Sequence, residues 1–182
     1  LISAILTSGK NSRLYQKFIY QDQSASAAVS FQSSSEIASQ FITWLNVKQG
    51  EDAAKLEKEL EAEIERFIKE GPTEEELKRV KANYFANFIK GMERIGGFGG
   101  VSDILASNQT YHGDASYYKT QLKYVEDATA EDLRRTAEKW LTKGKHVLIC
   151  RPFPEYDVVE SSVDRSKLPE LGAPKSSKFP EL

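Results

Sequence analysis

The sequence predicts an α+β domain in which a small antiparallel sheet is covered on one face by helices. Two segments rich in aromatic and β-branched residues, Ala25–Gln32 and Phe41–Val47, follow one another across a short polar turn. Neighbouring strands joined in this way pair antiparallel. Long stretches with apolar residues at every third or fourth position precede and follow them. Strands and helices that are grouped rather than alternating are typical of the α+β class.

Length and charge narrow the class of protein. The chain has 182 residues, enough for one domain with a sizeable core. Its net charge of -2 gives no electrostatic preference for nucleic acid or an anionic membrane. No apolar run approaches the ~20 residues that a membrane span needs. The single cysteine, Cys150, excludes an internal disulfide and a thiolate zinc cluster.

The chain begins within an apolar helix pattern. Residues Leu1–Leu6 form an apolar helix face without a capping residue before it, which favours a piece of a longer polypeptide. A glycine-containing break at Ser8–Asn11 separates this helix from a second one, expected over Ser12–Tyr20.

The two strands carry most of the expected sheet. In the first, Ala27, Val29 and Phe31 alternate and share one face. In the second, Trp44 lies centrally and is expected in the core. A third strand is expected at Lys145–Cys150, in the same sheet, because it contains the apolar run Val147–Cys150.

Four helices are expected between the hairpin and the final strand. The first covers Asp52–Glu70, and Thr73 with Glu76 forms a capping box for the second. A third runs through Ile104 and Leu105, and Thr129 caps a fourth that ends near Trp140–Leu141. The buried stripe of the first of these helices is Ala53, Leu56, Leu60, Ile64 and Phe67, and that of the second is Leu77, Val80, Tyr84, Phe88 and Met92.

The sequence changes character after Arg151. Five of the six prolines lie beyond it, and the apolar residues there lose both the 2- and the 3.6-residue period. We therefore expect a domain over residues 1–153 and an extended Pro-rich linker over residues 154–182.

Four motifs in order carry a resemblance to a known family. They are GKNSRLY at Gly9–Tyr15, EGPTEEEL at Glu70–Leu77, GGFGG at Gly96–Gly100 with Asp103, Leu105, Tyr111 and Gly113–Asp114 after it, and VEDATAEDL at Val125–Leu133. Together they resemble the C-terminal-type, non-zinc domain of the M16 (pitrilysin/insulinase-type) zinc metallopeptidases. The tail, VDRSKLP at Val163–Pro169 followed by Phe179–Pro180, resembles the linker between the two units of large bacterial members.

The resemblance implies a place in a larger enzyme. The fold would be a LuxS/mitochondrial-processing-peptidase-like half, with its opening strand or strands upstream of Leu1. The chain would be the second domain of the first unit, a structural, substrate-enclosing domain without catalytic residues. Zinc would belong to the parent protein's N-terminal domain, the partners would be the other M16 domains and peptide substrates, and the location would be periplasmic or secreted. The alternatives are a scaffold or interaction module of an M16-like protein that has lost peptidase activity, and a generic α+β binding domain.

The residues themselves supply no catalytic set. M16 catalysis requires the inverted zinc motif HxxEH, and the two histidines here, His112 in an expected loop and His146 at a strand start, are far apart in the sequence. The family's substrate-binding Arg and Tyr positions are occupied by Ile19 and Ser26, which offer no guanidinium or phenol. The sequence thus predicts no catalytic, metal-binding or substrate-binding residue in this chain.

Two other features leave alternatives open. Arg13 either pairs with a carboxylate across the domain or lies solvated or packed on the surface. The glycines of Gly96–Gly100 serve either as a hinge or as helix-packing positions with positive φ. The sequon at Asn108 is interpreted as chance, and Glu51–Lys81 as a solvated helical face.

Overall fold

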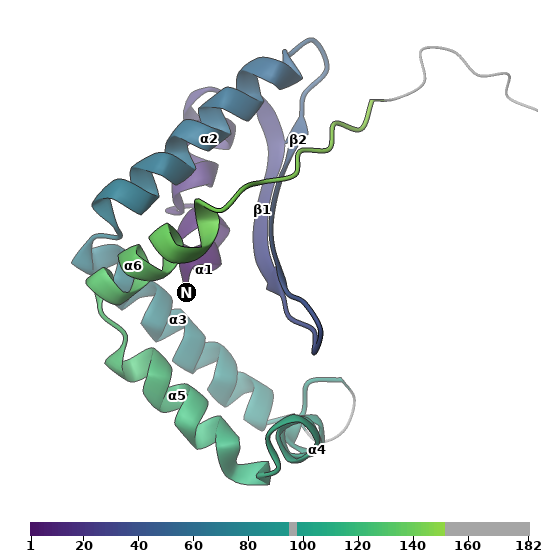
Figure 1. Ribbon diagram of the computed structural model, residues 1–182, viewed down its shortest axis with the longest axis vertical. Coiled ribbons are helices and arrows are strands. Elements are labelled where there is room, and N and C mark those ends of the chain that lie inside the picture. The colour runs from purple at the N-terminus through teal and green to yellow at the C-terminus, as the bar shows by residue number, and fades with distance from the viewer. Residues whose placement is uncertain (95–97, 152–182) are drawn as a thin grey trace, which may run out of the picture. The chain divides into compact units, whose positions relative to one another are not determined.

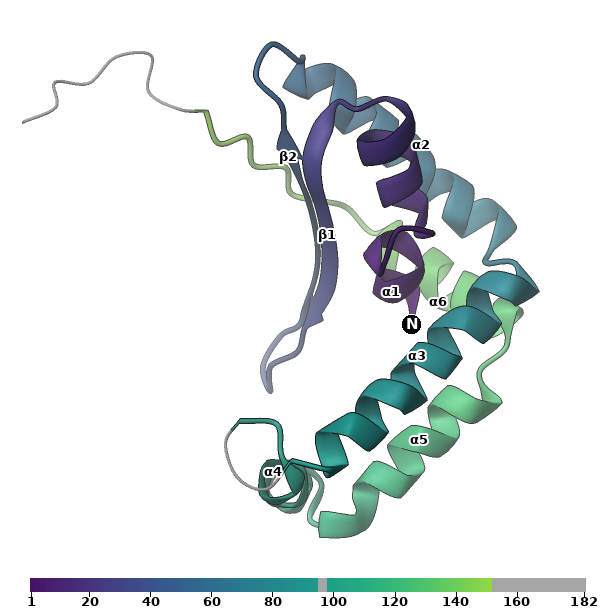
Figure 2. The same cartoon turned by 180° about the vertical axis from the view of Figure 1, so that it is seen from behind.

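The computed structural model describes residues 1–94 and 98–151, and the compact unit Leu1–Val147 contains the fold. A two-stranded antiparallel hairpin lies against helices that gather on one of its sides (Figure 1; Figure 2). The α+β class is thus confirmed. The elements in chain order are α1 (Ile2–Thr7), η1 (Tyr15–Gln21), β1 (Ala25–Ser33), β2 (Gln40–Val47), α2 (Ala53–Glu70), α3 (Glu74–Met92), α4 (Val101–His112), η2 (Ala115–Tyr117), α5 (Tyr118–Asp127) and α6 (Ala130–Leu141).

The first helical segment ends where the sequence predicts. Gly9 in the break after α1 has a φ of +79°, a conformation that side-chain-bearing residues rarely adopt. The helix expected over Ser12–Tyr20 is present, but from Tyr15 it is a π-helix, in which the Asp22 amide donates to the Lys17 carbonyl at 2.9 Å. Apolar residues four apart fit either form, so the sequence could not separate them.

The hairpin has the predicted pairing and one irregularity. Ala25 lies opposite Val47 but Ala27 lies opposite Asn46, so Ser26 is an extra residue in β1, a β-bulge. The bulge changes the alternation of faces. Ala25 is fully buried, and beyond the bulge Ala28 packs against the same core. Every second residue of β1 from Ala27 onward therefore faces away from the helices.

Two sequence-based expectations about the sheet are wrong. Trp44 is 44% exposed and lies opposite Val29 on the face away from the helices, because its neighbour Leu45 packs against the core and successive residues of β2 face opposite sides. Lys145–Cys150 forms no strand, and within the described residues the sheet consists of β1 and β2 alone. A strand exists only through ladder bonds to a neighbour, so a β-prone sequence without a partner stays irregular.

Helices α2 and α3 meet at a tight junction. Asp52 caps α2, and Gly71 ends it with a φ of +72°. A Cβ at Gly71 would lie 3.2 Å from the Arg134 Cβ, so glycine also allows α6 to approach. The capping box is present as predicted: the Glu76 amide donates to the Thr73 hydroxyl at 3.1 Å, and the Thr73 amide donates to the Glu76 carboxylate at 2.8 Å.

The core is formed by the early elements, the first half of α3 and α6. The predicted stripe of α2 is fully buried at Leu56 and Phe67, with Leu60 partly buried, and that of α3 only at Leu77 and Val80. Helix α5 was not expected from the sequence. The buried hydrophobic residues are Ile5, Leu6, Leu14, Phe18, Ala25, Leu56, Phe67, Leu77, Val80, Leu133 and Ala137.

The expected linker over residues 154–182 lies outside the described residues. The described helices include none that is both long and apolar enough to cross a membrane.

Candidate functional site

The face of the hairpin that points away from the helices carries two exposed aromatic rings. We call it the outer hairpin face and define it by Ala27, Val29, Phe31, Ile42 and Trp44. Phe31 and Trp44 meet edge to face, with ring centroids 5.6 Å apart and an interplanar angle of 83°. Phe31 is 37% exposed and Trp44 is 44% exposed, so both rings reach solvent.

Neither strand contains a charged residue. The side chains that face the helices are tied by short polar contacts instead: the Ser30 and Thr43 hydroxyls lie 3.0 Å apart, and the Ser30 amide donates to the Thr7 hydroxyl at 3.0 Å. These bonds fix the hairpin on α1. The outer hairpin face carries no charge, and Asn46, opposite Ala27, adds one exposed polar side chain beside its apolar residues.

Ile19 and Ser26, the two positions that the family resemblance would assign to substrate binding, lie beside and within this hairpin. Ile19 is half-buried in η1, and Ser26 is exposed at the bulge, where its hydroxyl donates to the Asn46 carbonyl at 3.3 Å. Neither side chain can supply a charged or phenolic contact to a peptide backbone.

Arg13 resolves into the first of its two alternatives, a carboxylate pair across the domain. Its Nε and Nη2 donate to the two Glu76 carboxylate oxygens, each at 2.7 Å, and Nη2 also donates to the Gly71 carbonyl at 2.9 Å. The guanidinium lies over the Phe67 ring at 5.1 Å from its centroid. Arg13 therefore joins the segment before η1 to the α2–α3 junction.

The electrostatics of this pair follow from its partial burial. Burial opposes ionisation of Glu76, but the hydrogen bonds from Arg13 and Thr73 outweigh it, and the pKa of the carboxyl lies below its ordinary value of 4.5. The bond to Glu76 likewise raises the pKa of Arg13. Glu63, a buried carboxylate in α2 that the sequence pattern did not reveal, lies near the same guanidinium and accepts a bond from Arg66 at 2.6 Å. The Arg13–Glu76 pair thus connects two helical segments, whereas Glu63–Arg66 is a separate pair within α2.

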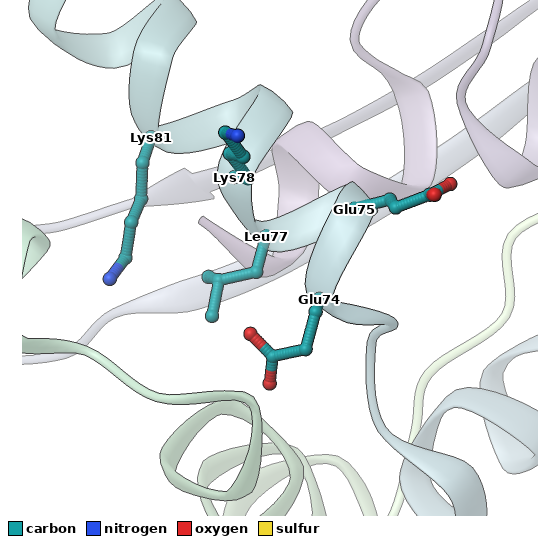
Figure 3. A pocket seen from close by; sticks show the side chains of 5 residues that line it. All are labelled: Glu74, Glu75, Leu77, Lys78 and Lys81. Carbon is teal, nitrogen blue, oxygen red and sulfur yellow. The ribbon is translucent and has the colours of Figure 1, made fainter.

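A shallow hollow of about 420 Å³ lies along the first turns of α3 and is lined by Glu74, Glu75, Leu77, Lys78 and Lys81 (Figure 3). Figure 3 shows Glu75 pointing away from the side on which Glu74 and Leu77 lie. The Lys81 ammonium donates to the Glu126 carbonyl at 2.7 Å. The lining mixes both charges and contains no nucleophile, so it suggests no chemistry.

The histidines are far from any such cluster. His112 is the last residue of α4 rather than part of a loop, and its ring stacks on Tyr117 at 3.9 Å. His146 is exposed. Among residues 1–94 and 98–151, no three His, Cys, Asp or Glu side chains gather as a metal site would require. Asn108 is only 5% exposed within α4, which agrees with a chance sequon.

Comparisons with known proteins found one matching family profile and several solved structures of similar fold. Residues 1–84 match the sequence profile of the family described as "Peptidase M16 inactive domain". No curated protein matches the chain. A protease from Helicobacter pylori is similar in structure, with a TM-score of 0.66 and 25% identity, over 77% of this chain and 33% of that protein. The chain thus spans about one third of that relative's length.

Two further solved structures share the fold. A predicted zinc protease from Bordetella pertussis Tohama I gives a TM-score of 0.65 at 22% identity, over 76% of this chain and 74% of that one. The inactive peptidase domain of a predicted zinc protease from Bordetella parapertussis gives 0.66 at 19% identity, over 84% and 81%. The profile match over residues 1–84 and the shared fold make the chain similar to the inactive, C-terminal type of M16 domain.

Proposed function

We propose that this chain is a non-catalytic, substrate-enclosing domain of a zinc-dependent metalloendopeptidase that degrades peptides. The observation that carries the proposal is the match of residues 1–84 to the M16 inactive domain. The parent's zinc and its catalytic carboxylate would lie in another domain, and this domain would contribute a wall of the space in which the peptide is held. The parent would act in the periplasm or outside the cell.

The outer hairpin face supports a wall function. A chamber wall must contact peptides of many sequences without binding any one of them tightly. An uncharged apolar surface meets this requirement because it makes no directional bonds to the peptide. Ile19 and Ser26 also support a wall function. Neither position supplies the charged or phenolic contact of the family's substrate clamp. The Arg13–Glu76 ion pair connects the segment that leads into η1 and the hairpin to the α2–α3 junction.

The experiment is a binding and cleavage test on the full 182-residue chain. Labelled peptides of mixed sequence and about 12 residues, roughly the length of strand that could cross the hairpin, are titrated by fluorescence anisotropy. We expect saturable binding with a Kd on the order of 0.1–1 mM, because an open surface buries little of the peptide. We expect no cleavage with or without added zinc.

Two results would count against the proposal. Cleavage that depends on His112 or His146 would show a catalytic centre in this chain. A complete lack of peptide binding would remove the enclosing role and favour a scaffold module instead.

A further inference from the structure

We propose that the outer hairpin face selects neutral, apolar segments of extended peptides, with Phe31 and Trp44 as the principal contacts. This inference rests on the proposed function and names the class of substrate that the wall would favour.

The first step is the continuity of the apolar surface. Val29 lies opposite Trp44, and Phe31 lies opposite Ile42, so four large apolar side chains form two adjacent cross-strand pairs. The edge-to-face contact between Phe31 and Trp44 orients both rings while leaving a large part of each in water. A ring that is already ordered loses little conformational entropy when a ligand packs on it.

The second step is charge. No charged residue occurs in β1 or β2, whereas α6 carries ion pairs such as Arg134–Glu131 and Arg135–Asp132 along its surface. A charged peptide side chain placed over the outer hairpin face would lose hydration and gain no counter-charge. A neutral apolar side chain gains burial at no such cost. The face therefore discriminates against both acidic and basic segments.

The third step is spacing. In an extended peptide, side chains on one side recur about every 6.6 Å, at two residues per repeat. The Phe31 and Trp44 ring centroids are 5.6 Å apart, so successive same-side residues of a peptide can each meet one ring. Sequences with apolar residues at alternate positions should fit this face best.

A second copy of the chain is a weaker occupant. Stable protein interfaces bury about 800 Å² per partner, and four side chains on a hairpin that are already partly covered by one another offer far less. A peptide needs only a few such contacts, because weak binding is sufficient for a chamber wall.

The test compares three labelled peptides of equal length: one alternating Leu or Phe with Ser, one acidic and one basic. Titrations use the full chain and its variants Phe31→Thr and Trp44→Thr, which keep β-propensity while removing each ring. Trp140→Thr removes another exposed aromatic residue, on α6, and is the matched control. Trp44→Tyr keeps an aromatic ring and should retain binding.

We expect the neutral peptide to bind roughly fivefold to tenfold more tightly than either charged peptide. Each Thr variant on the hairpin should weaken the neutral peptide by a similar factor, and Trp140→Thr should leave it unchanged. In a Trp140→Phe background Trp44 is the sole tryptophan, and its emission should shift to the blue when the neutral peptide binds.

The outcomes separate the inference from the proposed function. Equal binding by the Thr variants with unchanged circular dichroism, or a preference for a charged peptide, overturns the inference and leaves the wall function intact. Concentration-dependent dimers that disappear in Trp44→Thr assign the face to a second copy and also overturn it. If no peptide binds the unaltered chain, the proposed function fails as well.

Discussion

The described chain has one region built around a core and another that has almost none. Residues 1–80 together with α6 supply all eleven buried hydrophobic side chains. The described part of residues 81–128, which we call the helical arm, contributes none, and its buried residues are Gly100 and the polar Asn108. Helix α3 runs from one region into the other (Figure 1).

The arm is held by different contacts. Phe88 stacks on Tyr118 at 5.8 Å, and the Asp114 carboxylate caps η2 by accepting from the Ser116 amide at 2.8 Å. Apolar residues such as Ile89 and Tyr111 remain largely exposed. Local stability follows buried apolar contacts, so the cored region should dominate the unfolding free energy while the arm opens at lower cost. Helices in the two regions thus contribute differently to the unfolding free energy, although both regions are helical.

The largest expected effect comes from the centre of the cored region. Phe67→Ala should lower the unfolding free energy by about 3–5 kcal/mol, because Phe67 is fully buried and the change leaves a cavity. Ile89→Ala, in the arm and 59% exposed, should change it by less than about 0.5 kcal/mol. Urea denaturation followed by circular dichroism measures both, and similar losses would mean that the arm shares the core.

Removing the Arg13 guanidinium from the α2–α3 junction should cause the next largest loss of unfolding free energy. Arg13→Ala leaves the partly buried Glu76 carboxylate without its partner and should cost about 2–4 kcal/mol. Arg135→Ala, which breaks an exposed pair with Asp132 on α6, should cost at most about 1 kcal/mol. A double-mutant cycle between Arg13 and Glu76 gives the coupling directly, and a coupling near zero would contradict the junction role.

The pH dependence of stability is a second test of the contribution of the Arg13–Glu76 pair. The pKa of Glu76 is lowered in the folded state, so its contribution is present above the ordinary value of 4.5 and is lost as pH falls through the lower folded value. Glu76→Gln should therefore flatten the acid side of the stability curve below that pH. Denaturant melts at a series of pH values measure this, and parallel curves for the two proteins would show that Glu76 is not linked to folding.

The smallest effect is expected from a helix cap. Thr73→Ala should cost about 1 kcal/mol by removing the hydroxyl that accepts from the Glu76 amide. Thr73→Ser keeps the hydroxyl and is the control. A loss larger than that of Phe67→Ala would reverse the assigned ranking of cap and core.

Local signals in the sequence were sufficient for most of the fold. Thr73 with Glu76 forms the predicted capping box, and Thr129 caps α6 as predicted, with Asp132 completing a second box, since each cap depends on residues within one helical turn. The pairing of β1 with β2 was also predictable from local sequence, because a short polar turn joins the two strands. Helix α5 was missed, because its start at Tyr118 has no side-chain cap and η2 precedes it without a break in composition.

Sequence-based predictions failed where contacts between residues far apart in the chain determine the structure. Lys145–Cys150 has the composition of a strand, but pairing is decided by a neighbour that no local pattern supplies. Trp44 was expected in the core because it lies centrally in an aromatic and β-branched run, but that composition does not tell which face of the strand a residue takes. The choice between a paired and a solvated Arg13 also required the fold, since its partner lies 63 residues away.

The bulge at Ser26 makes the hairpin sensitive to chain length at one point. Deleting Ser26 would restore strict alternation after Ala25, and every later residue of β1 would change sides. Val29 and Phe31 would then turn toward α1, while Ser30 would lose its bond to Thr7 and point to solvent. A codon lost at this position would thus exchange the inside and outside of the strand without altering one other amino acid, so related sequences should tolerate substitutions here far better than insertions or deletions.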